Sequence, residues 1–397
     1  MDSILNSGEN KKQEINERDG TETTEKNKDR PVLVRGNNDN NQPVPKEKDQ
    51  TSNVGVYNPD VNTSINDKGN QRLQAFSKYN FVPGDKIIFH DDLTGEESGE
   101  FPSRWDLFQG NAENASLGSE NIINMENRAI ISPLMENDEY LPEVFTIEFD
   151  AYFEDVPGTW QSYRLRFWEG KGYLNISREE NYHPLHIQNN GGSFQIRSKG
   201  NVRKYESAGN QFKENIPGWR HVALAFNKRT LKMFLDQHRV LNIPNLNLKP
   251  KIFSIEGYSY RDGIRAIKNI RIAEGGKKLY DRVIADGKFV TRGILFDVNK
   301  ASIKPESMGV LNTVAKMMRE YTDLNFRIEG HTDADGSDES NLQLSNKRAS
   351  SIKNALTNLG IDASRFETKG LGESVPVSDN TSPEGKANNR RVEFIKI

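Results

Sequence analysis

The chain has 397 residues, enough for two ordinary domains and a tail. Its net charge is −3 at pH 7, and it shows no basic stripe of the kind that nucleic-acid-binding proteins carry, so we expect no nucleic-acid partner. The absence of cysteine excludes disulfides and thiolate metal sites, and we expect neither a metal nor a cofactor.

Residues 1–80 are rich in Asn, Asp, Glu, Lys and Gln, and their scattered apolar residues follow no period of 2 or 3.6. Such a segment cannot bury enough apolar surface to offset its ordering entropy. We therefore predict a disordered tether, with a processing remnant of no function as the alternative. The first residues, MDSILNSGENKKQEINERDG, also lack the apolar stretch of an export signal, and no apolar run in the chain approaches the roughly 20 residues of a membrane helix.

Residues 84–276 contain many short apolar-alternating runs separated by Gly, Asn and Pro, a pattern typical of an all-β sandwich. In VFTIEFDAYF the residues at 145, 147, 149, 151 and 153 are apolar, and Glu148 and Asp150 lie on the opposite, solvated face. The predicted strands cover Lys86–Phe89, Ala129–Ile131, Phe145–Phe153, Tyr163–Trp168, Phe194–Arg197, His221–Phe226, Leu231–Leu235 and Ile267–Ile272.

The run WRHVALAFNKRTLKMFLDQHRV predicts a hairpin that turns near Asn227–Arg229. Together with the FTIEFDAYF strand and the closing strand at Ile267, it resembles a laminin-G or concanavalin-A-like jelly roll. A fold of this kind says little about function.

From Lys277 onward strands and helices alternate, with KKLYDRVIADG as the expected connector between two domains. We predict strands at 293–297, 326–330, 367–370 and 391–397, a helix that starts at Pro305, and a second helix from about Asn341 to Leu359. The resulting fold class is multidomain: a jelly-roll sandwich followed by an α/β domain of βαβαβ-β order in residues 287–397.

Several motifs in this last region agree in order and spacing with one family. They are ILFDVNKASIKPES, IEGHTDADGSDESNLQLSNKRASSIKNAL, GIDASRF, KGLGES and PEGKANNRRVEF. On these motifs the region resembles the OmpA-like C-terminal domain family. The resemblance implies non-covalent binding of the peptidoglycan stem peptide at its diaminopimelate residue.

Diaminopimelate presents an ammonium and a carboxylate on one carbon, so its recognition needs an anion and a cation at fixed separation. At the family's positions, Asp333 ends a strand and Arg348 lies on the following helix. Asp333 would accept hydrogen bonds from the ammonium, and Arg348 would bind the carboxylate with two nitrogens, which a lysine could not do. Each contact is worth about 1.5–3 kcal/mol, enough together for micromolar-scale binding.

Four further positions match the family's polar binding residues: Asn299, Thr332, Asn341 and Arg390. Taken singly, an Asp before small residues is often only a turn residue, and an Arg on a helix is usually solvated. The family spacing of the set favours binding. His331 is interpreted as a packed histidine, and Arg391 and Glu393 as a sheet-surface pair.

The sandwich leaves two alternatives open. Glu148 and Asp150 resemble the strand-borne acids of one class of glycoside hydrolases, but Tyr152 stands where the third acid is needed, so we interpret them as charges on a solvated face. The aromatic residues Trp160, Tyr163, Trp168, Tyr173 and Tyr182 give the second hypothesis, a surface that binds a glycan or an envelope protein.

The function implied by the resemblance is a non-catalytic cell-envelope protein anchored to peptidoglycan. The alternative is a wall-processing enzyme whose OmpA-like domain only targets a catalytic sandwich. The implied location is the periplasm, in association with the outer membrane and the cell wall. We therefore expect that a targeting segment, with a lipid-anchor cysteine, has been removed from the N-terminus.

Overall fold

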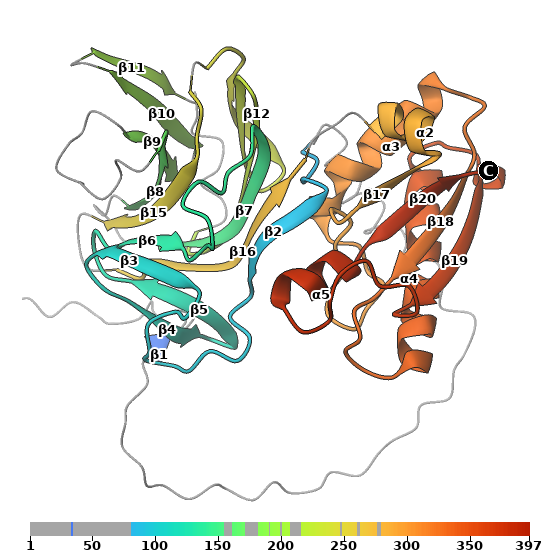
Figure 1. Cartoon of the computed structure of the whole chain (residues 1–397), viewed down its shortest axis with the longest axis horizontal. Coiled ribbons are helices and arrows are strands. Elements are labelled where there is room, and N and C mark those ends of the chain that lie inside the picture. Colours follow the sequence, from blue (N-terminus) through green and yellow to red (C-terminus); the bar gives the residue numbers. More distant parts are fainter. Residues whose placement is uncertain are drawn as a thin grey trace, which may run out of the picture.

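The computed structural model describes residues 33–34, 81–154, 161–170, 182–189, 191–198, 201–206, 216–246, 248–259, 263–275 and 279–397. Two bodies lie side by side: a sandwich of strands and a smaller domain of helices and strands (Figure 1). Within these residues no helix is long and apolar enough to span a membrane. Apart from the two-residue strand β1, the predicted tether lies outside the described residues.

The sandwich consists of two sheets, and each of the eight predicted runs lies within or overlaps one of its strands. The first sheet has the order β1-β4-β5-β16-β7-β12-β13-β14, with β2 also on β16, and the second has the order β11-β10-β9-β8-β15-β6-β3. The strands are β1 Leu33–Val34, β2 Lys86–Asp91, β3 Trp105–Gln109, β4 Ala112–Leu117, β5 Glu120–Met125, β6 Ile130–Pro133, β7 Val144–Phe153, β8 Gln161–Trp168, β9 Tyr182–Gln188, β10 Gly191–Ser198, β11 Asn201–Glu206, β12 Gly218–Asn227, β13 Thr230–Leu235, β14 His238–Ile243, β15 Ile252–Ser259 and β16 Ala266–Glu274.

The core between the two sheets follows the predicted alternation. Phe145, Ile147 and Phe149 of β7 are at most 1% exposed and pack in one cluster with Tyr163 and Phe167 of the second sheet. The predicted hairpin is also present, because β12 pairs antiparallel with β13. The region is therefore a β-sandwich, and its resemblance to a jelly roll stays a prediction.

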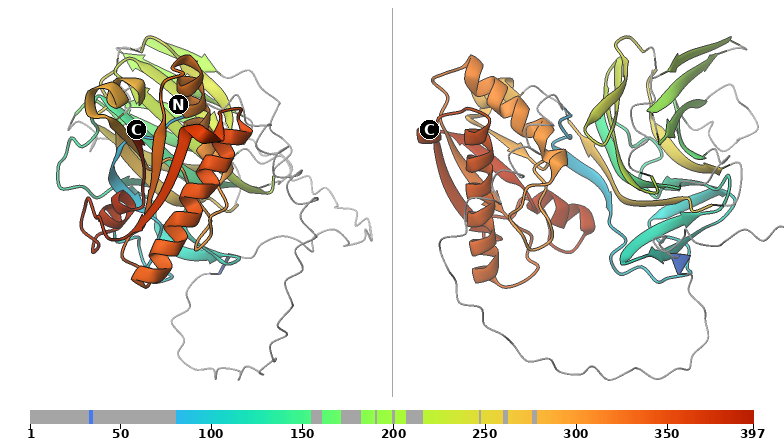
Figure 2. Two further views of the ribbon diagram at one scale, coloured as in Figure 1. Left: turned by 90° about the vertical axis from the view of Figure 1, so that its right-hand side faces the viewer. Right: turned by 180° about the vertical axis from the view of Figure 1, so that it is seen from behind.

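The C-terminal domain has a four-stranded mixed sheet of order β17-β20-β18-β19, in which only β18 and β19 run parallel. The long helix α4 packs on β18 and β19, which Figure 2 displays from two further sides. Its elements are α2 Leu279–Asp286, β17 Lys288–Thr291, α3 Met308–Glu320, β18 Phe326–His331, α4 Asp338–Asn358, β19 Phe366–Gly372, α5 Pro383–Asn389 and β20 Val392–Lys396.

Local sequence explains where some of these elements begin. Of the strands predicted in this domain, the one at 293–297 was wrong. Helix α4 starts before Asn341 because the Ser337 side chain accepts a hydrogen bond from the amide of Ser340. The strand predicted at 293–297 does not form. Its backbone instead bonds to the Ser307 hydroxyl and to Lys304, which leaves only an isolated bridge between Phe296 and Ile303.

The expected connector forms α2, whose Leu279 and Val283 join the apolar core of the C-terminal domain. Three residues that precede or belong to the sandwich join the same core: Phe81, Ala223 and Phe234. The two domains therefore share a continuous apolar contact.

Helix α5 packs beside β2, where the two domains adjoin (Figure 1). The Asn388 side chain accepts a hydrogen bond from the amide of Ile87 at 3.2 Å and donates one to the Ile87 carbonyl at 3.1 Å. Glu384 accepts from the amide of His90 and pairs with Arg104. These side chains satisfy backbone groups on the edge of β2 that would otherwise be free to pair with another chain.

The polar face of β7 is not solvated, contrary to the interpretation from sequence. Glu148 is 3% exposed, and both its oxygens lie 2.6 Å from a terminal nitrogen of Arg271. His221 lies opposite Asp150 in the β7–β12 register, 2.8 Å from its carboxylate and 3.7 Å from that of Glu148. Arg271 also donates to the carbonyl of Arg292, so the C-terminal domain covers this face.

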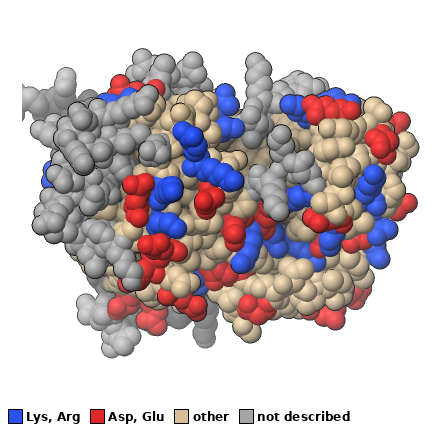
Figure 3. Space-filling model, turned by 45° about the horizontal axis from the view of Figure 1, so that its top comes forward, with Lys and Arg blue, Asp and Glu red and all other residues tan. Residues whose placement is uncertain are grey.

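Burial favours neutral forms of these groups, but their mutual attraction outweighs it. The two carboxylates raise the pKa of His221 to about 10, and the pKa values of Glu148 and Asp150 are lowered by Arg271 and His221 respectively. The face under the C-terminal domain is therefore a set of paired charges. On the side of the molecule drawn in Figure 3, Lys and Arg side chains lie next to Asp and Glu side chains.

A glycine in α3 tests the docking of the two domains. A Cβ atom at Gly309 would lie 1.7 Å from the carbonyl oxygen of Phe81. We expect Gly309→Ala to lower the free energy of unfolding by about 1–3 kcal/mol, because the clash exceeds the gain of about 1 kcal/mol in helix propensity. Chemical denaturation measures the change, with Asn354→Ala, exposed on α4, as the control. An equal or higher stability of Gly309→Ala would mean that the Phe81 segment does not pack on α3.

The stability should depend on the protonation of His221. Its pKa is near 6.5 in the unfolded chain and about 10 in the fold, so its contribution is complete below pH 6.5 and is lost as the pH rises through 10. We expect the Tm to fall over this window and the fall to be smaller in His221→Gln. The control His238→Gln changes an exposed histidine on β14 and should keep the full dependence. Identical pH profiles for His221→Gln and the parent would contradict the assignment.

Candidate functional site

A cavity of about 510 Å³ lies where the C-terminal domain meets the sandwich. All six positions singled out from the sequence line it: Asn299, Thr332, Asp333, Asn341, Arg348 and Arg390. They come from the loop before α3, the end of β18, the helix α4 and the segment between α5 and β20. The fold thus brings together residues that are up to 91 positions apart in the chain.

Asp333 follows the end of β18, where the amide of Thr332 donates to the carbonyl of Gly372 at 2.9 Å. Asp333 is 8% exposed, and its carboxylate accepts a hydrogen bond from the amide of Asp335. Its second oxygen lies 2.6 Å from a terminal nitrogen of Arg390. The ion-pair partner of Asp333 within the chain is therefore Arg390, not Arg348.

Arg348 points into the same cavity from α4. Its Nε donates to the carbonyl of Lys300 at 3.0 Å, and its guanidinium carbon lies 4.8 Å from the ring centre of Phe296. Desolvation lowers the pKa of Arg348, with the Asp333 charge acting against this and Arg390 acting with it. Among the described residues, neither terminal nitrogen of Arg348 has a hydrogen-bond partner, so both can donate to a ligand carboxylate.

The other three positions differ in role. The amide nitrogen of Asn341 donates to the carbonyls of Asp333 and Asp335 and to the carboxylate of Glu373, so it holds the loop that carries Asp333. Thr332 is 4% exposed, and its hydroxyl has no partner within the described part of the chain. Asn299 is exposed at φ +55°, a conformation that asparagine tolerates, in the loop at the cavity's edge.

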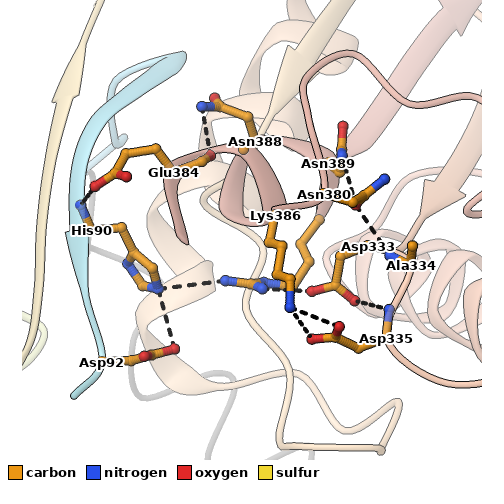
Figure 4. Close-up of polar contacts among 12 residues, drawn as sticks. His90, Asp92, Asp333, Ala334, Asp335, Asn380, Glu384, Lys386, Asn388 and Asn389 are labelled. Atoms are coloured by element: carbon orange, nitrogen blue, oxygen red, sulfur yellow. Dashed lines mark hydrogen bonds and ion pairs between the residues drawn. The ribbon is translucent and has the colours of Figure 1, made fainter. Parts of the chain in front are cut away.

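Arg390 connects the two domains at this site. Besides Asp333, its guanidinium lies 3.4 Å from Nε2 of His90 in β2, and His90 is 3.6 Å from Asp92 (Figure 4). Beside Asp333, Lys386 of α5 forms an ion pair with Asp335 at 2.8 Å (Figure 4). The loop after β18 is thus held by cations from α5 and from the residue after it.

The sandwich forms the other wall of the cavity, which the sequence does not predict. His90, Asp150, His221, Asn269 and Arg271 all line it. The signal was present in the charged residues that alternate with apolar ones along β7. The polar side of β7 was expected to be solvated because nothing in the sequence indicates that another domain covers it.

Glu148 and Asp150 do converge on one cavity, as a catalytic pair of carboxylates would. A glycoside hydrolase of this type needs one carboxyl group with a raised pKa that serves as the acid. Here Arg271 and His221 lower the pKa values of Glu148 and Asp150 against the effect of burial. The geometry therefore fits charge pairing better than acid–base catalysis.

The remaining residues named from the sequence are packed. His331 is 4% exposed, and burial, with Arg391 acting in the same direction, lowers its pKa to about 4. Arg391 and Glu393 do form a pair at 2.7 Å, but a buried one. No group of three or more residues that could hold a metal ion occurs in the described ranges.

The aromatic surface proposed for the sandwich is not formed by its two fully described members. Tyr163 is 0% and Trp168 2% exposed, so both rings belong to the interior. Trp160, Tyr173 and the side chain of Tyr182 lie outside what the structure describes.

The model of the OmpA family matches residues 295–390. The chain is 39% identical over 128 residues to the probable lipoprotein YiaD of Escherichia coli, covering 30% of this chain and 58% of that protein. It is 38% identical over 107 residues to the peptidoglycan-binding protein ArfA of Mycobacterium bovis, covering 27% of this chain and 33% of ArfA.

Among solved structures, the peptidoglycan-associated lipoprotein of Burkholderia pseudomallei matches with 27% identity and a TM-score of 0.27, over 30% of this chain and 100% of that one. The curated relatives are matched over less than two thirds of their own lengths. Residues 295–390 of this chain form a domain of the OmpA family.

Proposed function

We propose that this protein anchors itself to bacterial peptidoglycan without catalysis, by binding the diaminopimelate of the stem peptide in the cavity beside Asp333 and Arg348. The observation that carries the proposal is that an acid and an arginine with free terminal nitrogens face one cavity. The names of two relatives, a peptidoglycan-binding protein and a peptidoglycan-associated lipoprotein, support the same ligand.

The chemistry of the two groups suits one end of diaminopimelate. A carboxylate has about four acceptor positions, and Asp333 accepts hydrogen bonds from Arg390 and from the amide of Asp335, so an ammonium can share it. The terminal nitrogens of Arg348 can bind a carboxylate bidentately while Phe296 and the Lys300 carbonyl fix the guanidinium plane. Neither contact makes or breaks a bond.

The proposed location is the bacterial cell envelope, in the periplasm, with the outer membrane and wall as neighbours. The relatives include outer-membrane porins of Pseudomonas and a probable lipoprotein of Escherichia coli. The sandwich would then lie next to the wall-binding cavity, because it forms one side of it.

Removal of either charged group should release the protein from the wall. We expect Asp333→Ala and Arg348→Ala each to weaken cosedimentation with purified peptidoglycan by roughly 10- to 100-fold, since each contact is worth about 1.5–3 kcal/mol. Circular dichroism should stay unchanged. Lys316→Ala, on the exposed side of α3, is the control. If the double variant Asp333→Ala/Arg348→Ala sediments like the parent, the site lies elsewhere.

A conservative change separates charge from geometry. Arg348→Lys keeps the positive charge but loses the planar pair of donors, so we expect the Kd for diaminopimelate to rise by about tenfold. Isothermal titration calorimetry measures it. Arg319→Lys, in the last turn of α3, makes the same change outside the cavity and should keep the parent's affinity. Full affinity of Arg348→Lys would show that charge alone is recognised.

A further inference from the structure

The cavity has two walls, and only one belongs to the OmpA-family domain. The other is formed by β2, β7, β12 and β16 of the sandwich, which contribute His90, Asp150, His221, Asn269 and Arg271. A ligand bound at Asp333 and Arg348 therefore lies in a space that the sandwich also encloses.

The size of the cavity exceeds what one end of diaminopimelate fills. One end of diaminopimelate, a carbon with its ammonium and carboxylate, has five heavy atoms. If each is given the volume of a water molecule in the liquid, about 30 Å³, this end fills roughly 150 Å³. The cavity measures about 510 Å³, within the range of sites that enclose a whole small molecule. Most of the space remains for the part of the ligand beyond its zwitterionic end.

The charges around the cavity indicate what that part must offer. Among the residues that line it, carboxylates outnumber Lys and Arg side chains by seven to four. The His221 side chain reduces this excess but does not remove it. Such a lining attracts N–H donors and disfavours further anions beyond the one carboxylate that Arg348 can bind.

Asp150 is an acceptor on the sandwich wall that a ligand can reach, and Asp92, just after β2, is a second and more exposed one. Its side chain is 21% exposed, whereas that of Glu148 is 4% exposed and bound by Arg271. One oxygen of Asp150 lies 2.8 Å from His221, and the other accepts from the amide of Asn269 at 2.6 Å. Two acceptor positions remain, and the carboxylate is fixed by His221 on β12 and by Asn269 at an irregular position of β16.

A second observation also points to a ligand in this cavity. Thr332 lines the opposite wall and is 4% exposed, and its buried hydroxyl has no partner among the described residues. Buried hydroxyls normally have a partner, because an unpaired one costs free energy. A peptide group between the walls would supply both an acceptor for Thr332 and a donor for Asp150.

We propose that the sandwich wall is a second subsite for the stem peptide, in which Asp150, oriented by His221 and Asn269, accepts a hydrogen bond from a peptide N–H next to the diaminopimelate. This inference rests on the proposed function, since the zwitterionic end must first be held at Asp333 and Arg348. Specificity then extends from a single amino acid to the peptide that carries it. The glycan strand is the competing occupant.

The test compares ligands of two lengths on the full chain by calorimetry. We expect the tetrapeptide L-Ala-γ-D-Glu-meso-diaminopimelyl-D-Ala to bind about tenfold more tightly than free meso-diaminopimelate. Asp150→Ala, which removes both acceptor oxygens, should remove this advantage and change the Kd of the free amino acid by twofold at most. Asn269→Gly, which suits the φ of +54° at that position, should remove part of it.

The outcomes are distinguishable. Glu100→Gln removes a charge from the sandwich outside the cavity and should keep the tetrapeptide's advantage. The subsite is refuted if both cavity variants retain the advantage or if they weaken both ligands equally. It is also refuted if the tetrapeptide binds no more tightly than free diaminopimelate and only a ligand that carries the disaccharide of N-acetylglucosamine and N-acetylmuramic acid does. If the parent binds neither diaminopimelate nor tetrapeptide, the proposed function fails first, and the second subsite with it.

Discussion

Glu148 and Arg271 lie on adjacent strands of the sandwich sheet that faces the C-terminal domain, and both are at most 9% exposed. Burying two charges costs several kcal/mol for each, and the cost is offset only when the geometry is good and the other hydrogen-bonding groups are satisfied. Here Arg271 contacts both oxygens of Glu148, and His221 lies between Glu148 and Asp150. Because these charges are internally paired, another domain can cover the face that carries them.

The cavity is a consequence of that arrangement. Where the docking is apolar, as at Phe81 and Phe234, the domains share one packed core. Where the sheet face carries paired charges, side chains from both domains stand apart and line a polar space instead. The six positions singled out from the sequence therefore lie at a domain boundary, although each belongs to the OmpA-family domain. The sandwich closes the other side of the space.

The sequence was most informative where one element decides the outcome. The alternation of apolar residues along Phe145–Phe153 is a property of one strand, and these apolar residues are indeed buried in the core. The motifs around Asp333 and Arg348 identified six positions that the fold brings to one cavity, which spacing alone could not have joined without a known family. By contrast, Gly293–Asp297 has strand-like composition, but tertiary hydrogen bonds to Ser307 and Lys304 take its backbone groups.

The contacts between residues of the two domains could not be predicted from the sequence, and the reason is physical. Whether Glu148 and Asp150 meet water or a protein surface depends on a domain that begins more than a hundred residues later, and no local pattern encodes this contact. The same holds for Arg390, whose contact with Asp333 requires β20 to lie beside β18. The helix α5 did have a local signal, since Ser382 and Pro383 form a regular helix start, but its docking on β2 did not.

The side chains of Asp333 and Arg348 are held in place by neighbours that need not touch the proposed ligand. Arg390 and the amide of Asp335 orient the Asp333 carboxylate, and Asn341 holds the loop beneath it. Phe296 and the carbonyl of Lys300 fix Arg348 in the same way. Groups that are already oriented lose little conformational freedom on binding, so more of each contact appears as affinity. Since Arg390 also lies against His90, part of this orientation comes from the sandwich, so both domains would contribute to binding of the proposed ligand.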